Sequence, residues 1–257
     1  MRIPLSWLRE LVAIPADETP ERLGERLVDV GLELEDIHTI GGDVLGPLVV
    51  GRVEQITELT EFKKPIRFCR VAVGAEHGHP DTPGERGIIC GARNFAEGDL
   101  VVVALPGAVL PGGFEIASRS TYGHISDGMI CSERELGLGD DHDGIIVLPP
   151  GSADVGASGR DVLGLGDVVL EVSVTPDMGF CLSMRGVARE LAHQYDVPFA
   201  DPGLALADLP APTGDEPHPC AVVDAGACGL FTLRTLVDVD PQAPSPMWMR
   251  RRLVMSG

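Results

Sequence analysis

Aromatic side chains are scarce in this chain: they make up 4% of its 257 residues. This scarcity excludes a large core of packed aromatic rings. No apolar run approaches the roughly 20 residues that a membrane-spanning helix needs. The opening segment MRIPLSWLRELV places charges where a signal peptide would be apolar. With 32 glycines and 21 prolines, the composition instead favours many short elements joined by turns.

Closely spaced cysteines are also lacking. No CxxC spacing occurs among the six cysteines, which argues against a zinc site. We therefore expect buried, reduced thiols in a cytoplasmic protein, with no metal bound by this segment. The cysteines are Cys69, Cys90, Cys131, Cys181, Cys220 and Cys228.

Basic residues are few: 20 Lys and Arg stand against 39 Asp and Glu, for a net charge of −19. A stand-alone nucleic-acid binder is usually basic, because neutralisation of phosphates dominates its affinity. Residues 39–149 carry nine Lys and Arg against sixteen Asp and Glu, a net charge of −7. Any RNA contact in this region must therefore come from a local basic patch, or from another segment or chain.

Catalytic signatures are missing as well. The sequence contains no GxSxG nucleophile elbow, P-loop, HExxH motif or paired-carboxylate constellation. The Gly-Leu-Gly pieces at 137–139 and 164–166 lack the third glycine and the strand–helix setting of a dinucleotide site, so we interpret them as turns. We expect no catalytic residue in this segment.

The stretch from 100 to 139 carries the most information. Leu100–Leu105 is a continuous apolar, β-branched run, which predicts a strand buried on both faces. Ser132 and Glu135 form a capping box, and Gly137 ends the helical turn that they begin. Short strands separated by turn clusters predict a small five-stranded barrel of OB type. The seven candidate strands from which this barrel would be built are Leu48–Ile56, Ile66–Val73, Gly87–Cys90, Leu100–Leu105, Phe114–Arg119, Met129–Cys131 and Ile145–Leu148.

The segments that flank this barrel have helical signals. Thr19 is a predicted N-cap followed by Pro20, and Ser183 is a predicted N-cap of a later helix. Val168–Val174 is predicted as a strand. We therefore expect an α+β protein in which the barrel, residues 41–150, is inserted into a small helical and mixed domain made of residues 1–40 and 151–200.

The C-terminal part is predicted to be a linker and an unfinished unit. Residues 201–219 are rich in proline and should form the linker. Residues 220–257 contain a predicted strand at Leu230–Val239 and a helix that starts at Ser245 and Pro246. About forty residues are too few to bury an independent core, so we expect this unit to be the start of a larger α/β domain.

Several long motifs, in order, resemble the β chain of bacterial phenylalanine–tRNA ligase. They are RIPLSWLRELV, LVDVGLELEDI, LVVGRVEQI, IICGARNFAEGDLVVVALPGAVLPGGF, SDGMICSERELGLGDDHDGIIVLP, VVLEVSVTPDMGFCLSMRGVARELA and SPMWMRRRL. The piece Ser126-Asp127-Gly128-Met129 is also similar to the Ser-x-Gly-Met signature of tRNA-binding OB modules. One departure is ELTEFKKPIRFC, which stands where many members have a His-Pro-Asn-Ala-Asp-Lys-Leu stretch.

The resemblance implies an amino-terminal fragment of a subunit of an aminoacyl-tRNA synthetase that attaches phenylalanine to its tRNA. On this resemblance, residues 220–257 are the truncated start of the editing (B3/B4-like) domain, and the fragment alone is inactive. ATP and Mg²⁺ are implied for the full enzyme and not for this segment. The implied partners are phenylalanine tRNA and the α chain, in a heterotetramer of two α and two β chains, with neither membrane nor DNA.

The predicted RNA contacts combine a basic cluster with the signature residues. The cluster lies at the first hairpin of the barrel, and OB folds bind nucleic acid through basic grooves with aromatic stacking. Two alternatives stay open: a purely structural module of the ligase without RNA contact, and a free-standing tRNA-binding OB protein. The predicted RNA-binding residues are Lys63, Lys64, Arg67, Arg70, Arg93, Asn94, Arg119, Ser126 and Met129, with Phe62, Phe68 and Phe95 as candidate stacking partners.

Overall fold

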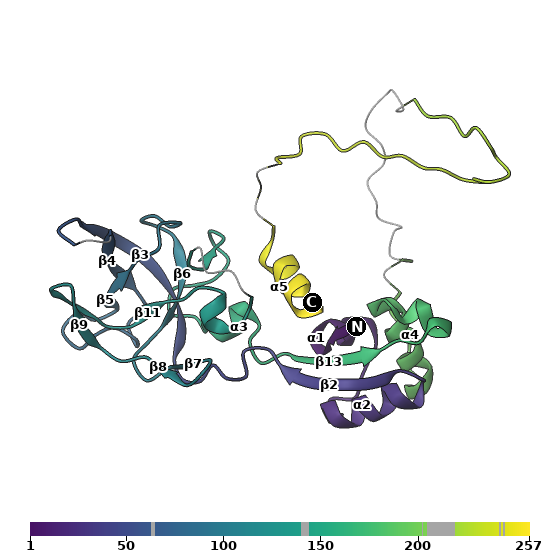
Figure 1. The fold of residues 1–257 in the computed structure, drawn as a ribbon, viewed down its shortest axis with the longest axis horizontal. Coiled ribbons are helices and arrows are strands. Elements are labelled where there is room, and N and C mark those ends of the chain that lie inside the picture. The colour runs from purple at the N-terminus through teal and green to yellow at the C-terminus, as the bar shows by residue number, and fades with distance from the viewer. Residues whose placement is uncertain (63–64, 140–143, 202, 205–218, 242, 244) are drawn as a thin grey trace. The chain divides into compact units, whose positions relative to one another are not determined.

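The computed structural model describes residues 1–62, 65–139, 144–201, 203–204, 219–241, 243 and 245–257. These residues divide into a first unit, residues 1–200 with 246–257, and a second unit, residues 201–245. Every helix and strand of the described residues belongs to the first unit (Figure 1). In the part of the chain that the structure describes, no helix has the length and apolarity to cross a membrane.

A three-stranded antiparallel sheet joins segments that lie far apart in the sequence. Its central strand is β13 (Val168–Ser173), which pairs with β1 (Arg2–Pro4) on one side and with β2 (Glu33–Thr39) on the other. The register places Ile3 opposite Leu170. Because both neighbours of β13 come from the start of the chain, residues 1–39 and 168–200 share one hydrophobic core.

Helices α1 (Leu5–Leu11), α2 (Pro20–Asp29) and α4 (Met184–Tyr195) pack around this sheet (Figure 1). The predicted N-caps of α2 and α4 are confirmed. The side-chain oxygen of Thr19 accepts a hydrogen bond from the backbone N–H of Arg22 at 3.3 Å. Ser183 Oγ accepts a hydrogen bond from the N–H of Gly186 at 3.0 Å. Ser183 follows the short 3₁₀ segment η2 (Pro176–Cys181). Local capping chemistry therefore sets where both helices begin.

Residues 48–148 form a second, curled antiparallel sheet. The strand order is β11-β6-β3-β4-β5, and β12 also pairs with β6. The edge strand β5 comes back into contact with β11, so the sheet curls upon itself. The strands are β3 (Leu48–Leu59), β4 (Ile66–Ala72), β5 (Glu85–Cys90), β6 (Leu100–Ala104), β11 (Met129–Ile130) and β12 (Val147–Leu148).

Strand β6 is buried along its whole length, as predicted. Leu100, Val102 and Ala104 face one hydrophobic cluster, and Val101 and Val103 face another. Alternate side chains of a strand point to opposite faces, so a strand covered on both sides is apolar at every position.

The predicted strand Phe114–Arg119 is wrong as a single element. The chain instead forms two hairpins, β7 (Val109–Leu110) with β8 (Phe114–Glu115) and β9 (Arg119–Thr121) with β10 (His124–Ser126). Ile116 bonds back to the start of the first hairpin, since its N–H donates to the carbonyl of Ala108 and its carbonyl accepts from the N–H of Gly107, both at 2.8 Å. Residues 116–118 belong to neither hairpin. The second hairpin lies beside the edge strand of the curled sheet, where β10 contacts β5.

The predicted capping box after β11 is confirmed. The Glu135 N–H donates to Ser132 Oγ at 3.3 Å, and Glu135 Oε2 accepts from the Ser132 N–H at 2.6 Å. One 3₁₀ turn follows, η1 (Arg134–Leu136), and Gly137 ends it with a φ of 68°. Helices α3 (Gly159–Leu163) and α5 (Met247–Ser256) complete the first unit. The predicted C-terminal helix is present but begins one residue later than expected, with Pro246 at the N-cap position and no side-chain cap.

Two predictions about the C-terminal part are wrong. Leu230–Val239 forms no strand, because the described residues of 201–245 offer it no partner strand. Cys220 and Cys228 are exposed, whereas the other four cysteines are buried and reduced as expected. The predicted linker, residues 201–219, lies mostly outside the described residues.

Candidate nucleic-acid interface

The structure distributes the predicted RNA-contacting residues over several elements of the curled sheet. Lys63 and Lys64 lie outside the described residues. Arg67 and Arg70 are on β4, Arg93 and Asn94 follow β5, Arg119 is on β9, Ser126 is on β10 and Met129 is on β11.

The predicted arginine cluster is split between two faces of β4. Cys69 and Val71 belong to the core, and Arg67 points to the same side, because alternate residues of a strand share a face. Its guanidinium lies 5.3 Å from the centre of the buried Phe95 ring. Arg70 points to the opposite side. The structure therefore does not bring these two guanidinium groups together on one surface.

Arg67 and Arg93 meet instead at one carboxylate, that of Glu58. The β3–β4 register places Glu58 directly opposite Arg67, and Arg67 Nε donates to Glu58 Oε1 at 2.9 Å. Arg93 donates to both carboxylate oxygens, at 3.1 and 2.8 Å. The hydrogen bonds from Arg93 hold the pKa of Glu58 below its ordinary value of 4.5; Arg67 acts in the same direction and desolvation opposes both. Both guanidinium groups are thus bonded to one carboxylate, which compensates half of the pair's positive charge within the protein.

Arg70 is compensated in the same way. Its Nε donates to Glu85 Oε2 at 3.1 Å, and a terminal nitrogen bonds to the same oxygen. An arginine that is already paired with a carboxylate must give up part of that interaction to bind a phosphate. The three arginines of the predicted cluster therefore offer less charge to RNA than their sequence positions indicate.

Asn94 and Ser126 hold neighbouring backbone segments in place. Asn94 Nδ2 donates to the carbonyl of Ile145 at 2.8 Å, and its Oδ1 accepts from the N–H of Ile145 at 3.0 Å. Ser126 Oγ accepts from the N–H of Ile89 at 3.0 Å. Both side chains therefore hold backbone segments of the curled sheet in position.

The candidate stacking rings are also occupied within the protein. Phe68 stacks on His124, with ring centroids 4.2 Å apart and planes at 19°. Phe62 packs edge-on against Tyr122 at 4.8 Å, and Phe95 is 5% exposed. Each of the three predicted rings therefore packs against another part of the protein.

The sequence did not indicate a buried ion pair that joins the signature segment to β5. Asp127 is 4% exposed and pairs with Arg86, whose Nε also donates to the carbonyl of His77 at 2.6 Å. The Asp127 N–H donates to the carbonyl of Gly87 at 2.8 Å. The signal that could have revealed it was an aspartate between Ser126 and Gly128 in an otherwise apolar stretch. The Arg86–Asp127 pair holds the turn before β11 against the start of β5.

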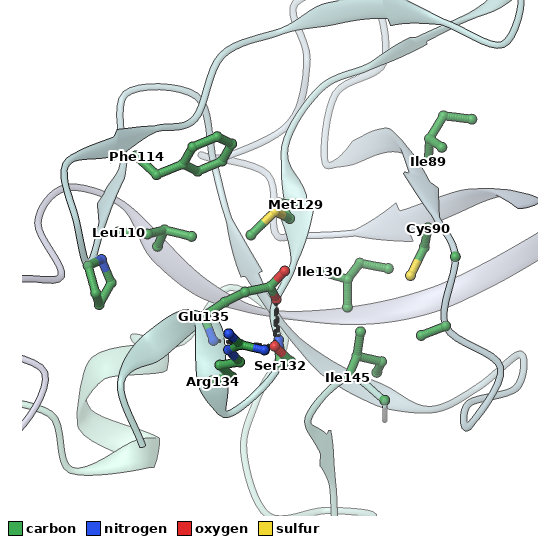
Figure 2. Close-up of a pocket in the computed structure, with 14 residues that line it drawn as sticks. Ile89, Cys90, Leu110, Phe114, Met129, Ile130, Ser132, Arg134, Glu135 and Ile145 are labelled. Carbon is green, nitrogen blue, oxygen red and sulfur yellow. Dashed lines mark hydrogen bonds between the residues drawn. The ribbon is translucent and has the colours of Figure 1, made fainter. Parts of the chain in front are cut away.

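Met129 lines an open groove of about 770 Å³ at the surface of the curled sheet. Figure 2 shows Phe114, Leu110 and Met129 on one side of it, and Ile89 and Cys90 on the other. Arg134, Ser132 and Glu135 form its polar end. The groove therefore combines an apolar lining with charged groups at one end.

Two arginines beside this groove have no carboxylate partner among the described residues. They are Arg119 and Arg134, and Arg134 was not among the predicted residues. The Arg119 guanidinium lies 5.7 Å from the centre of the Phe114 ring, and Arg134 lines the groove with Phe114. In the residues that the structure describes, no group of three or more His, Cys, Asp or Glu side chains could hold a metal ion.

Comparison with known proteins identifies relatives along the whole chain. Residues 48–158 match the family model described as a putative tRNA binding domain. The chain is 56% identical over 257 residues to the phenylalanine–tRNA ligase beta subunit of Thermobifida fusca. It is 52% identical over 263 residues to that of Nocardia farcinica and 53% over 261 residues to that of Mycolicibacterium paratuberculosis. Each alignment covers 100% of this chain and 30% of the relative, so the chain spans about 30% of the length of these relatives.

Similar solved structures include the CsaA chaperones of Picrophilus torridus and Bacillus anthracis. Both have a TM-score of 0.30 and 14% sequence identity, and they cover 43% of this chain. The matches extend over 88% and 87% of the two CsaA chains. A likeness this weak carries no argument about fold or function.

Proposed function

The chain belongs to the family of phenylalanine–tRNA ligase β subunits, and we propose that it supplies that enzyme with a tRNA-binding module and part of its structural frame. The observation that carries this proposal is the match of residues 48–158 to a tRNA binding domain inside a chain that aligns from end to end with the β subunits. On this proposal the segment holds no complete active site, and the chemistry of aminoacylation belongs to the rest of the enzyme.

The proposed module is a five-stranded barrel of OB type. The curled antiparallel sheet supports this, because β5 returns to contact β11. The pairing of β13 with β1 and β2 supports its description as an insertion, since the chain leaves the small mixed domain after β2 and re-enters it at β13. An OB module of this kind would present tRNA with a groove across its strands.

The proposal extends to the whole enzyme. A phenylalanine–tRNA ligase joins phenylalanine to its tRNA, and we propose ATP and Mg²⁺ as requirements of that complete enzyme and an α chain as the partner of this subunit. Residues 220–257 would then be the first part of the editing domain. The exposed apolar side chains of Leu230 and Leu236 are consistent with a segment that packs against further structure.

A second candidate function is a structural module without RNA contact. The pairing of Arg67, Arg70 and Arg93 with carboxylates favours it, because compensated charges attract phosphates weakly. The net charge of −7 over residues 39–149, from nine basic and sixteen acidic residues, points the same way. This candidate predicts no measurable RNA affinity for residues 48–158 at any salt concentration.

Titration of the 257-residue chain with phenylalanine tRNA at several salt concentrations separates the two candidates. A module that neutralises about four phosphates should give a log–log salt slope near −3. Binding that weakens with salt supports the tRNA-binding module, and an absence of binding even at about 50 mM salt would leave the structural role.

A further inference from the structure

We infer that the groove lined by Phe114, Met129 and Arg134 holds an unpaired RNA nucleotide, with its base against Phe114 and its phosphate at Arg119 and Arg134. This inference rests on the proposed tRNA-binding function and specifies it. It names the recognised element as a single-stranded nucleotide, as found in loops and at chain ends, and not the backbone of a duplex.

The first observation is where the arginines without a carboxylate partner lie. Of the nine basic residues in 39–149, Lys63 and Lys64 lie outside the described residues, which leaves seven arginines. Five of these seven pair with carboxylates. Of the remaining two, one lines the groove and the other lies against the ring of Phe114, which lines it. The five are Arg52, Arg67, Arg70, Arg86 and Arg93, and the two are Arg119 and Arg134.

The carboxylates beside Arg134 are engaged elsewhere. Glu133 forms an ion pair with Arg250 of α5. Glu135 Oε2 accepts hydrogen bonds from the N–H and the hydroxyl of Ser132, at 2.6 and 2.8 Å. The Arg134 guanidinium is therefore exposed and open to an anion, although the Glu135 charge lowers the positive potential at this end of the groove.

The lining of the groove suits a base. Phe114 is 49% exposed, and its ring also has the Arg119 guanidinium 5.7 Å from its centre. Phe62 and Phe68 instead pack against other rings, and Phe95 is buried. The neighbours of Phe114 are Met129 and Leu110, which extend the apolar surface (Figure 2). A volume of about 770 Å³ lies within the range of small-molecule sites and has room for one nucleotide.

Stacking on Phe114 requires that the base be unpaired. A base inside a helix has both faces covered by its neighbours, whereas bases in loops and single strands can be splayed onto aromatic rings. The groove therefore selects single-stranded RNA by geometry. Charge complementarity favours a phosphate-bearing ligand over an apolar peptide. Of the described arginines of the barrel, the two without a carboxylate partner lie at the groove, Arg134 in its lining and Arg119 against Phe114.

The test measures binding of the 257-residue chain to phenylalanine tRNA, to a single-stranded RNA tetranucleotide and to a short RNA duplex. Phe114→Ala should weaken tetranucleotide and tRNA binding by about 5- to 100-fold, since it removes one base–aromatic stack. The Arg119→Gln/Arg134→Gln variant should reduce the salt slope for the tetranucleotide by about 0.7, the value for one neutralised phosphate of a single strand. Phe114→Trp should retain affinity, which distinguishes a lost stack from a folding defect.

Control variants keep this inference separate from the proposed function. Arg52→Gln removes a cation that is paired with Glu54 at 2.8 Å, and should leave binding unchanged. If Arg70→Gln/Arg93→Gln abolishes tRNA binding while the Phe114 and Arg119/Arg134 variants bind as wild type, the groove inference is overturned and the tRNA-binding function stands. The inference is also overturned if the duplex binds as tightly as the tetranucleotide. Failure of the wild-type chain to bind any RNA overturns both.

Discussion

The buried ion pair between Arg86 and Asp127 provides a quantitative test of the fold around the proposed site. The side chain of Asp127 is 6% exposed and that of Arg86 is 15% exposed. Replacing Asp127 by Ala leaves a nearly buried guanidinium without its counter-charge, and loss of one partner of a buried pair costs about 3–5 kcal/mol. Arg86 keeps its hydrogen bonds to the carbonyls of His77 and Gly78 at 2.6 and 3.2 Å, so we expect the lower end, about 3 kcal/mol.

Glu54→Ala is the matched control. It also removes the carboxylate partner of an arginine, but Arg52 and Glu54 are 50% and 37% exposed. Exposed pairs contribute roughly 0–1 kcal/mol, so this variant should change the free energy of unfolding by less than about 1 kcal/mol. The contrast between the two variants isolates the effect of burial.

Urea denaturation gives the free energies of unfolding. With an m-value of roughly 2–3 kcal/mol/M, a loss of about 3 kcal/mol moves the midpoint down by about 1–1.5 M. Tryptophan fluorescence is a poor probe, because Trp7 and Trp248 both lie outside residues 48–158. Far-UV circular dichroism and amide exchange of β4 and β5 report on the curled sheet directly. An Asp127→Ala loss below about 1 kcal/mol, equal to that of the control, would refute the reasoning.

Three further predictions concern local chemistry. Ser132→Ala should destabilise the protein by about 1 kcal/mol in urea denaturation, because it removes the hydroxyl of the capping box. Arg93→Gln should raise the pKa of Glu58 toward its ordinary value, which an NMR titration can measure. In the wild-type protein the lowered pKa of Glu58 stabilises the fold above about pH 4.5, and this stabilisation is lost as the pH falls through the folded-state pKa. A native thiol titration should label Cys220 and Cys228 first and the buried thiols only on unfolding, and equal rates for all six would contradict the structure.

Burial explains the expected order of thiol reactivity. Desolvation raises the pKa of Cys69 and of Cys131 to about 12, so neither forms a reactive thiolate near neutral pH. Cys90 has its pKa raised in the same direction by burial, even though it lines the groove. Reaction in the folded protein is therefore expected at the exposed cysteines.

Elements defined by local chemistry could be predicted from the sequence. Thr19, Ser132 and Ser183 act as caps because their hydroxyls bond to backbone N–H groups within three residues. The strand Leu100–Ala104 could be predicted because every residue in it is apolar, which indicates a strand buried on both faces. The strand expected at Leu230–Val239 was wrong because a strand also needs a neighbour, which a local pattern does not reveal.

The charge state of the proposed site depends on pairing between distant residues. Arg67 lies opposite Glu58 only because the β3–β4 register shifts between Val53 and Gln55. Arg93 reaches the same carboxylate from 35 residues away. A count of basic residues cannot show this compensation, so the sequence indicated the arginine cluster and missed Arg134. Cross-strand register decides which cations remain available to RNA.

Ultraviolet crosslinking of the 257-residue chain to phenylalanine tRNA, with mass spectrometry of the crosslinked peptides, tests the central claim most directly. We expect crosslinks within residues 48–158, concentrated on the peptides that carry Phe114 and Met129. Crosslinks found only in residues 1–39 and 168–200, or none at all at low salt, would contradict the claim that the curled sheet is a tRNA-binding module.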